Sequence, residues 1–157
     1  MGLMAPAEWA KLKIVRKEGP GFNWGNPDKI DFDLANLLDE FCLQHSLSPV
    51  VTSGTQGKHL VDSEHYLGRA CDVMFPKLTL KELPDVFLKA LTFLSQDGKH
   101  FGGIGIYNQW RIAPGLAPIG GMHFDTRLDK KGHIETWVWT SKGMIPTSLA
   151  NLTENFQ

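Results

Sequence analysis

One short stretch of the chain, SEHYLGRACDVMF, contains a histidine and an aspartate that could together bind a metal ion. Its second half has the apolar pattern of a buried strand, with Asp72 in the middle. A buried carboxylate is costly unless a cation or hydrogen-bond donors meet it. His65 lies seven residues upstream, and Gly68 between them allows a tight turn. His123, in the later stretch GGMHFD, can reach the same point from a neighbouring strand.

These three residues form a candidate metal site. Imidazole nitrogen and carboxylate oxygen are ligands of Zn²⁺, and catalytic zinc sites use three protein ligands and leave one position for water. We therefore predict that His65, Asp72 and His123 bind one Zn²⁺ per chain. From spacing alone a second interpretation stays open, in which Asp72 accepts backbone amides or pairs with Arg69 or Arg127.

The secondary structure expected around these residues indicates one α+β domain over residues 1–157, with an irregular arm over 1–30 and a core over 31–140. Apolar periodicity predicts helices over about 33–45 and 84–98. A capping box from Thr79 to Glu82 precedes the second helix, whose buried apolar stripe is expected to end at Leu94. A short helix is expected in the tail after Gly143. Alternation and composition predict a mainly antiparallel sheet with strands over 49–53, 70–75, 102–108, 121–127 and 134–140.

Three further expectations concern how these elements pack. The last two strands are expected to form a hairpin across the turn LDKKGH. Trp9, Phe22 and Trp24 are expected to pin the arm onto the domain. Trp137 and Trp139 alternate onto one strand face, where core packing is favoured over a role in walling a cleft.

The stretch from Ser63 to Asp72 fits the pattern Ser-x-His-x-x-Gly-x-Ala-x-Asp. It resembles the zinc D-alanyl-D-alanine carboxypeptidase and L-alanyl-D-glutamate endopeptidase family, whose fold is shared with hedgehog signalling domains. The similarity covers roughly residues 31–140 and extends to Val51–Gly54, to GGIGIY and to HFDTR. It implies that the helices pack on one side of the sheet, that His65 and Asp72 bind zinc, and that His123 is the third ligand.

Two departures from the family pattern leave parts of the site open. Thr55 and Gln56 replace a Tyr-Arg pair whose arginine binds a substrate carboxylate, so Lys58, Arg69 or Arg127 would have to do this. Gly120 stands where many members carry an acidic general base three residues before the last zinc ligand.

Asp125 is the predicted general base, because the period of two in a strand places Asp125 and Arg127 on the face of His123. The alternative role for Asp125 is to support an imidazole or Arg127. His59 and Asp62 are the other candidate bases.

Two further residues are candidates for contact with substrate. Tyr107 is predicted to hydrogen-bond the tetrahedral intermediate, or else to close the core. Ser63 is predicted to contact substrate or, more simply, to fix its own turn.

Composition narrows the class of protein. The 157 residues carry a net charge of −1, with 42% hydrophobic and 21% charged residues, which favours a globular domain and gives no basic stripe for nucleic acid. No apolar run approaches the roughly 18 residues of a membrane span, and the N-terminus lacks the pattern of a signal peptide.

The resemblance implies a zinc metallopeptidase that hydrolyses stem peptides of peptidoglycan, as a carboxypeptidase or endopeptidase. A phage or prophage lytic enzyme is expected, made in the cytoplasm and released by a holin or carried in a virion. Muropeptide recycling inside the cell is also open. The alternative is a non-catalytic zinc module that binds cell wall or belongs to a phage particle.

Overall fold

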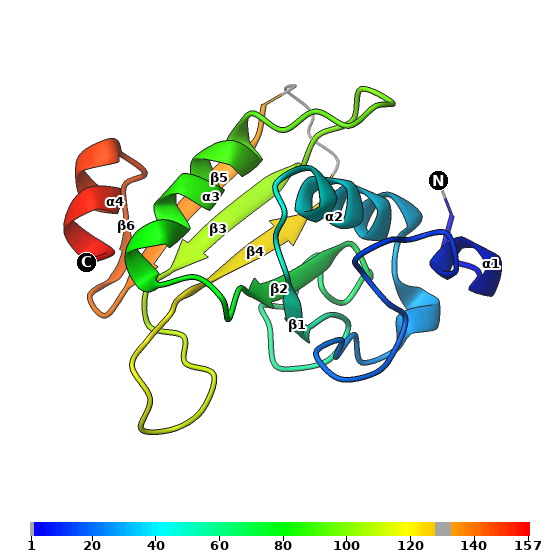
Figure 1. The fold of residues 1–157 in the computed structure, drawn as a ribbon, viewed down its shortest axis with the longest axis horizontal. Coiled ribbons are helices and arrows are strands. Elements are labelled where there is room, and N and C mark those ends of the chain that lie inside the picture. Colours follow the sequence, from blue (N-terminus) through cyan, green and yellow to red (C-terminus); the bar gives the residue numbers. More distant parts are fainter. Residues whose placement is uncertain (1, 128–132) are drawn as a thin grey trace.

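The computed structural model describes residues 2–127 and 133–157 and shows one α+β domain (Figure 1). Its helices are α1 (Pro6–Trp9), α2 (Phe32–Gln44), α3 (Leu83–Leu91) and α4 (Leu149–Asn155), with 3₁₀ turns η1 (Pro27–Lys29) and η2 (Leu80–Glu82). Its strands are β1 (Val50–Ser53), β2 (Ala70–Met74), β3 (Gly103–Tyr107), β4 (Gly121–Asp125), β5 (Glu135–Thr140) and β6 (Gly143–Ile145).

The strands form one mostly antiparallel sheet in the order β1-β2-β4-β3-β5-β6. The pair β3 and β5 is parallel, and the other four neighbouring pairs are antiparallel. This order places β4 in the middle of the sheet, where both of its edges are hydrogen-bonded to neighbours.

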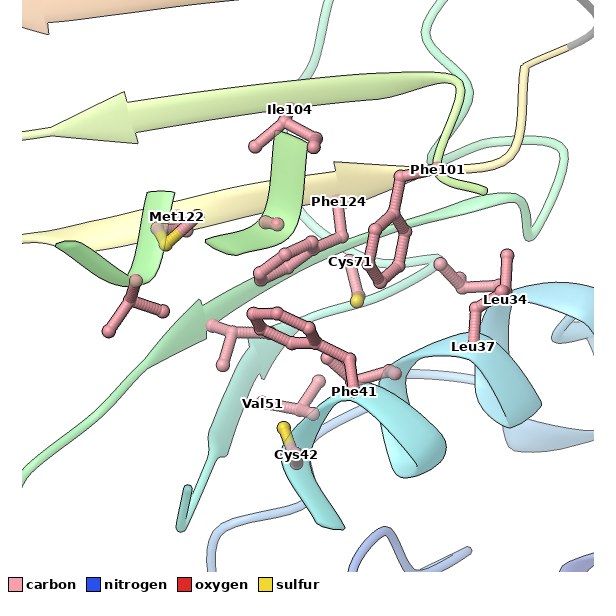
Figure 2. Close-up of a cluster of buried hydrophobic side chains, with 14 of the residues drawn as sticks. Leu34, Leu37, Phe41, Cys42, Val51, Cys71, Phe101, Ile104, Met122 and Phe124 are labelled. Carbon is pink, nitrogen blue, oxygen red and sulfur yellow. The ribbon is translucent and has the colours of Figure 1, made fainter. Parts of the chain in front are cut away.

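One face of the sheet packs against α2 and α3 (Figures 1 and 2). Alternate residues of β3 and β4 point into this core, including Ile104 and Phe124, each 0% exposed. Phe41 of α2 meets Phe124 with ring centroids 5.8 Å apart. Phe87 of α3 belongs to the same buried cluster. The side chains between these core positions therefore point to the opposite face.

The predicted hairpin between the strands at 121–127 and 134–140 is wrong. β5 pairs with β3 in parallel and with β6, whereas β4 pairs with β2 and β3. The segment between β4 and β5 is long enough to pass β3, so adjacency in sequence does not impose pairing. The predicted turn LDKKGH lies outside the described residues except for His133.

The capping box predicted before the second helix is confirmed. Glu82 accepts hydrogen bonds from the Thr79 backbone N–H at 2.6 Å and from the Thr79 hydroxyl at 2.8 Å.

The second predicted helix ends earlier than its apolar stripe. The regular helix stops at Leu91, so Leu94 is 60% exposed and Phe93 is buried in its place. Phe93 packs on Phe41 with centroids 5.3 Å apart, and this tertiary contact decides which side chain turns inward.

The N-terminal arm is held by aromatic burial and by one carboxylate. Trp9 and Trp24 are buried, with ring centroids 5.5 Å apart, as predicted. Asp39 of α2 accepts the backbone N–H groups of the segment 13–15 at 2.6–3.1 Å. Three donors to one buried carboxylate offset its desolvation and tie the arm to α2.

Candidate metal centre

The face of the sheet opposite α2 and α3 carries the predicted site residues. Met122 and Phe124 of β4 point into the core, so His123 and Asp125 point the other way. Asp72 of β2 is directly opposite His123 in the antiparallel register. The two strands therefore bring Asp72 and His123 together from positions far apart in sequence.

His65 reaches the same point from the loop that joins β1 to β2. Its turn closes through the Gly68 N–H, which donates to the His65 carbonyl at 3.0 Å. Gly68 has φ +71°, and a Cβ there would collide with the Lys29 carbonyl oxygen. Only glycine combines this backbone conformation with this close approach, so Gly68 fixes where His65 enters the site.

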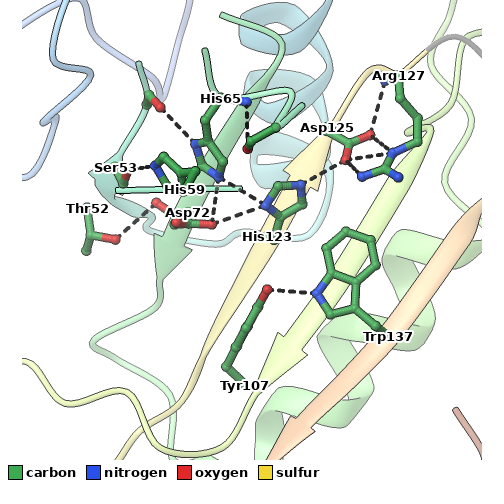
Figure 3. A network of polar contacts seen from close by, with 12 residues as sticks. Thr52, Ser53, His59, His65, Asp72, Tyr107, His123, Asp125, Arg127 and Trp137 are labelled. Atoms are coloured by element: carbon green, nitrogen blue, oxygen red, sulfur yellow. Dashed lines mark hydrogen bonds and ion pairs between the residues drawn. The ribbon is translucent and has the colours of Figure 1, made fainter. Parts of the chain in front are cut away.

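The three side chains converge on one point, as Figure 3 shows. His65 Nε2 lies 3.2 Å from His123 Nδ1 and 3.4 Å from Asp72 Oδ1. His123 Nδ1 lies 3.2 Å from Asp72 Oδ1. Four ligands placed tetrahedrally at about 2.0–2.1 Å from Zn²⁺ would be roughly 3.3–3.4 Å apart. The spacing of these three atoms fits a zinc ion.

The outer nitrogens of both imidazoles show which atoms face the site. His65 Nδ1 lies 2.8 Å from the Gly54 carbonyl, and His123 Nε2 lies 2.8 Å from Asp125 Oδ2. Both partners only accept, so these two nitrogens must carry the hydrogens. The neutral rings then turn their lone pairs on His65 Nε2 and His123 Nδ1 toward the Asp72 carboxylate. Three acceptors at this distance need a cation between them, either a metal ion or protons.

The charges in the site agree with this requirement. Burial alone would raise the pKa of Asp72, but hydrogen bonds with His123 and His65 outweigh it and hold that pKa at about 2. Burial would lower the pKa of His123, yet hydrogen bonds to Asp125 and Asp72 raise it above its ordinary 6.5. In the metal-free chain, a proton on His123 therefore takes the place of the cation at pH values below this raised pKa.

This competition predicts how zinc affinity depends on pH. Below the raised pKa of His123, one proton must leave for each zinc that binds, so affinity falls as pH falls. We expect the dissociation constant to rise about tenfold per pH unit below that pKa, which lies above 6.5. Zinc titrations at several pH values measure the slope. An affinity that stays constant down to pH 5 would show that His123 does not ligate.

A second histidine of the loop also lies at the site. His59, His65 and Asp72 form a group that could hold a metal ion, with ligand atoms within 4.8 Å of one another. The His59 ring stacks on His65, with centroids 3.8 Å apart and planes 4° apart. His59 Nε2 lies 2.8 Å from the Gln56 carbonyl. The shorter contacts of His123 favour it over His59 as the third ligand.

The sequence predicts His59 as a candidate base and not as a member of the ligand group. Its position depends on how the loop over residues 54–69 folds back on itself. Tyr66 contributes to this fold, because its hydroxyl bonds the His59 backbone N–H at 2.9 Å and carbonyl at 3.2 Å. His59 in SGTQGKH and His65 in SEH are only six residues apart, and this pair is the sequence signal that could have indicated a shared site.

Asp125 is placed behind the ligands. It is 0% exposed and bonds His123 Nε2 at 2.8 Å and Arg127 Nη2 at 2.5 Å. Burial would raise its pKa, but His123 and Arg127 outweigh this and hold the pKa at about 2. These contacts favour the supporting role, in which Asp125 orients His123, over the predicted role of general base. Proton transfer by Asp125 stays an untested prediction.

Replacing Asp125 by Asn separates the two roles. If Asp125 orients His123, the loss of its charge should weaken zinc binding by about 10–100-fold. A base that does not hold the ligand would leave zinc affinity unchanged and lower only the rate. Competition with a chromophoric chelator measures the affinity. Glu135→Gln is the matched control, because Glu135 bonds Arg127 Nη1 at 2.7 Å without touching His123.

The predicted substrate-binding residues have mixed placements. Arg127 is engaged by Asp125 and Glu135, and its Cζ lies 5.3 Å from the centre of the Trp137 ring. Arg69 Nε lies 3.1 Å from Glu64 Oε2. Both arginines therefore already have carboxylate partners within the chain.

The two hydroxyl candidates differ in what they contact. The Ser63 hydroxyl accepts the His65 N–H at 3.3 Å, as expected for fixing the turn. Tyr107 lies on the site face and accepts a hydrogen bond from Trp137 Nε1 at 2.7 Å.

The interpretation of Trp137 and Trp139 as core residues is wrong. Both lie on the site face, opposite buried Val138, and Trp139 is 42% exposed. The Trp137 ring lies 4.9 Å from the His123 ring and covers Gly105, where a Cβ would collide with it. Trp137 therefore forms one wall of the site, and glycine in the neighbouring strand makes room for it.

Comparisons with protein-family models, with curated proteins and with solved structures found no match to this chain. No helix among the described residues is long and apolar enough to cross a membrane.

Proposed function

We propose that the protein is a zinc-dependent peptidase that hydrolyses stem peptides of peptidoglycan. The observation that carries the proposal is the triangle of His65 Nε2, His123 Nδ1 and Asp72 Oδ1, with sides of 3.2–3.4 Å. The resemblance of the segment from Ser63 to Asp72 to the zinc D-alanyl-D-alanine peptidases supplies the substrate class.

His65, Asp72 and His123 would hold the ion, and three protein ligands leave a position for water as in catalytic zinc sites. Zinc supplies a Lewis acid and lowers the pKa of a bound water toward about 7. The chain itself keeps the two rings in the tautomers that ligate, through the Gly54 carbonyl and the Asp125 carboxylate.

Hydrolysis also needs a group that takes a proton from water and passes it to the leaving amine. Among the candidates, Asp125 is buried behind His123, Asp62 is exposed, and His59 is half-buried beside His65. Position thus favours His59 over Asp62 as the next residue to test.

The experiment is digestion of purified peptidoglycan by zinc-loaded and chelated protein. New amino groups should appear only with zinc, and mass spectrometry of the released fragments identifies the bond. Loss of a C-terminal residue indicates a carboxypeptidase, whereas separated peptide fragments indicate an endopeptidase. Zinc-loaded protein that releases nothing would argue against the proposal.

A second candidate function is a non-catalytic zinc module of a cell-wall-binding or phage structural protein. Gly120 favours it, because the carboxylate expected three residues before His123 is missing. The engagement of Asp125 by His123 and Arg127 points the same way. Such a module would bind zinc and peptidoglycan and would cut no bond.

A further inference from the structure

The site face of the sheet has an ordered pattern of neighbours. Asp72, His123, Gly105 and Trp137 lie side by side across four strands. One step further along the strands, Gly121, Tyr107 and Trp139 form the next row. Tyr107 is therefore one row away from the predicted zinc ligands and on their face.

Trp137 links Tyr107 to those ligands. Its ring lies beside the His123 imidazole, with centroids 4.9 Å apart. Its indole Nε1 donates to the Tyr107 oxygen at 2.7 Å. Figure 3 shows the phenol and the indole meeting beside His123. The Tyr107 ring is held from its other side by Trp110, stacked at 4.3 Å and 16°.

The hydrogen bond that Tyr107 accepts leaves its own hydroxyl hydrogen available to donate. An indole N–H only donates, so the phenol oxygen is the acceptor in this pair. Among the described residues, no acceptor takes the phenol hydrogen. Burial raises the pKa of Tyr107 to about 12, more than the hydrogen bond from Trp137 lowers it, so the hydroxyl keeps its hydrogen at neutral pH.

We propose that Tyr107 is a catalytic residue that donates a hydrogen bond to the carbonyl oxygen of the scissile peptide. Water adds its oxygen to the carbonyl carbon, and the π electron pair moves onto the carbonyl oxygen. When that pair returns, the carbon–nitrogen bond breaks and the nitrogen leaves as an amine with the proton taken from water. The products are an amine and a carboxylic acid, and the acid passes the second water proton to solvent and becomes a carboxylate. Tyr107 keeps its own proton throughout.

Trp137 is the positioning residue for this hydroxyl. A donor placed in advance where negative charge develops stabilises the transition state more than the substrate. The inference rests on the proposed peptidase function, since it assigns a role within that reaction.

Tyr107→Phe tests the assignment, because it removes the hydroxyl and keeps the ring that stacks on Trp110. We expect parental zinc content and melting temperature, a KM within a few-fold, and a kcat lower by about 10²–10³. Affinity for a phosphinate pseudodipeptide, whose tetrahedral oxygens resemble the transition state, should fall about 10–100-fold by calorimetry. Thr92→Val is the control for loss of a hydroxyl, because Thr92 donates to the Lys89 carbonyl at the end of α3, on the opposite face of the sheet, and it should leave the phosphinate affinity unchanged.

Trp137→Phe supplies a second test if Tyr107→Phe fails to fold. It removes the indole N–H and should lower kcat more than it raises KM. If the parent hydrolyses peptidoglycan and Tyr107→Phe matches it in rate and phosphinate affinity, the assignment of Tyr107 is wrong and the peptidase function stands. If Tyr107→Phe loses zinc, the residue is structural. A zinc-loaded parent without activity overturns both proposals.

Discussion

His123→Ala is expected to lose high-affinity zinc binding, whereas His59→Ala is expected to keep it. His123 Nδ1 lies 3.2 Å from both His65 Nε2 and Asp72 Oδ1, which fits a shared ion. Mutating a residue that only orients a ligand typically costs about 10–100-fold in metal affinity. Removing a ligand itself should cost more than about 100-fold.

His59→Ala is the control because it removes the histidine that stacks on His65 and keeps all three residues of the triangle. Its Nε2 lies 2.8 Å from the Gln56 carbonyl, so the ring already has a partner. Elemental analysis after dialysis should find about one zinc per chain in the parent and in His59→Ala. The reverse result, with zinc kept by His123→Ala and lost by His59→Ala, would assign the metal to the group His59, His65 and Asp72.

Zinc is expected to raise the melting temperature of the parent and not that of Asp72→Ala. A ligand that binds only the folded state at a thousand times its dissociation constant adds about 4 kcal/mol to the free energy of unfolding. In a chain of 157 residues this corresponds to roughly 8–16 °C. Calorimetry with and without zinc measures the shift.

Asp85→Ala is a matched control, since Asp85 is an exposed carboxylate that pairs with Lys89 far from the site. It should show the full zinc-dependent rise. If zinc does not change the melting temperature of the parent, protonated imidazoles alone compensate the charge of the Asp72 carboxylate. Asp72 would then be paired within the chain with His65 and His123, and not with Arg69 or Arg127 as the second interpretation predicted.

Much of the site follows from local pattern. The period of two in HFD places His123 and Asp125 on one face, and the apolar run around Asp72 marks a buried strand with its carboxylate on that same face. Helix α2, which begins at Phe32, follows from its apolar periodicity and from its N-cap Asp31, whose carboxylate accepts the Leu34 N–H. Such features depend on residues a few positions apart.

The remainder depends on contacts between distant segments. The register that sets Asp72 opposite His123 joins strands about 50 residues apart, and no local rule specifies it. The parallel pairing of β3 with β5 puts Trp137 over Gly105 and so turns an expected core residue into a wall of the site. The stacking of His59 on His65 likewise depends on the fold of a long loop.

For Asp125 the sequence offers both a base and a supporting role, and the preference for the supporting role comes from the three-dimensional contacts. Alternation predicts that Asp125 shares a face with His123, but it does not distinguish a base from a group that holds the ring. The distinction comes from Arg127, which bonds both oxygens of Asp125 and leaves the carboxylate fully buried. A carboxylate held in this way orients its neighbour and is poorly placed to reach water.

Diffraction from crystals of the zinc-loaded protein, recorded on both sides of the zinc absorption edge, would show which residues bind the ion. We expect one anomalous peak bonded to His65 Nε2, His123 Nδ1 and Asp72 Oδ1, at about 2.0–2.2 Å from each. A peak bonded to His59 in place of His123, or a site with no peak and with Asp72 bonded to protonated imidazoles, would contradict it.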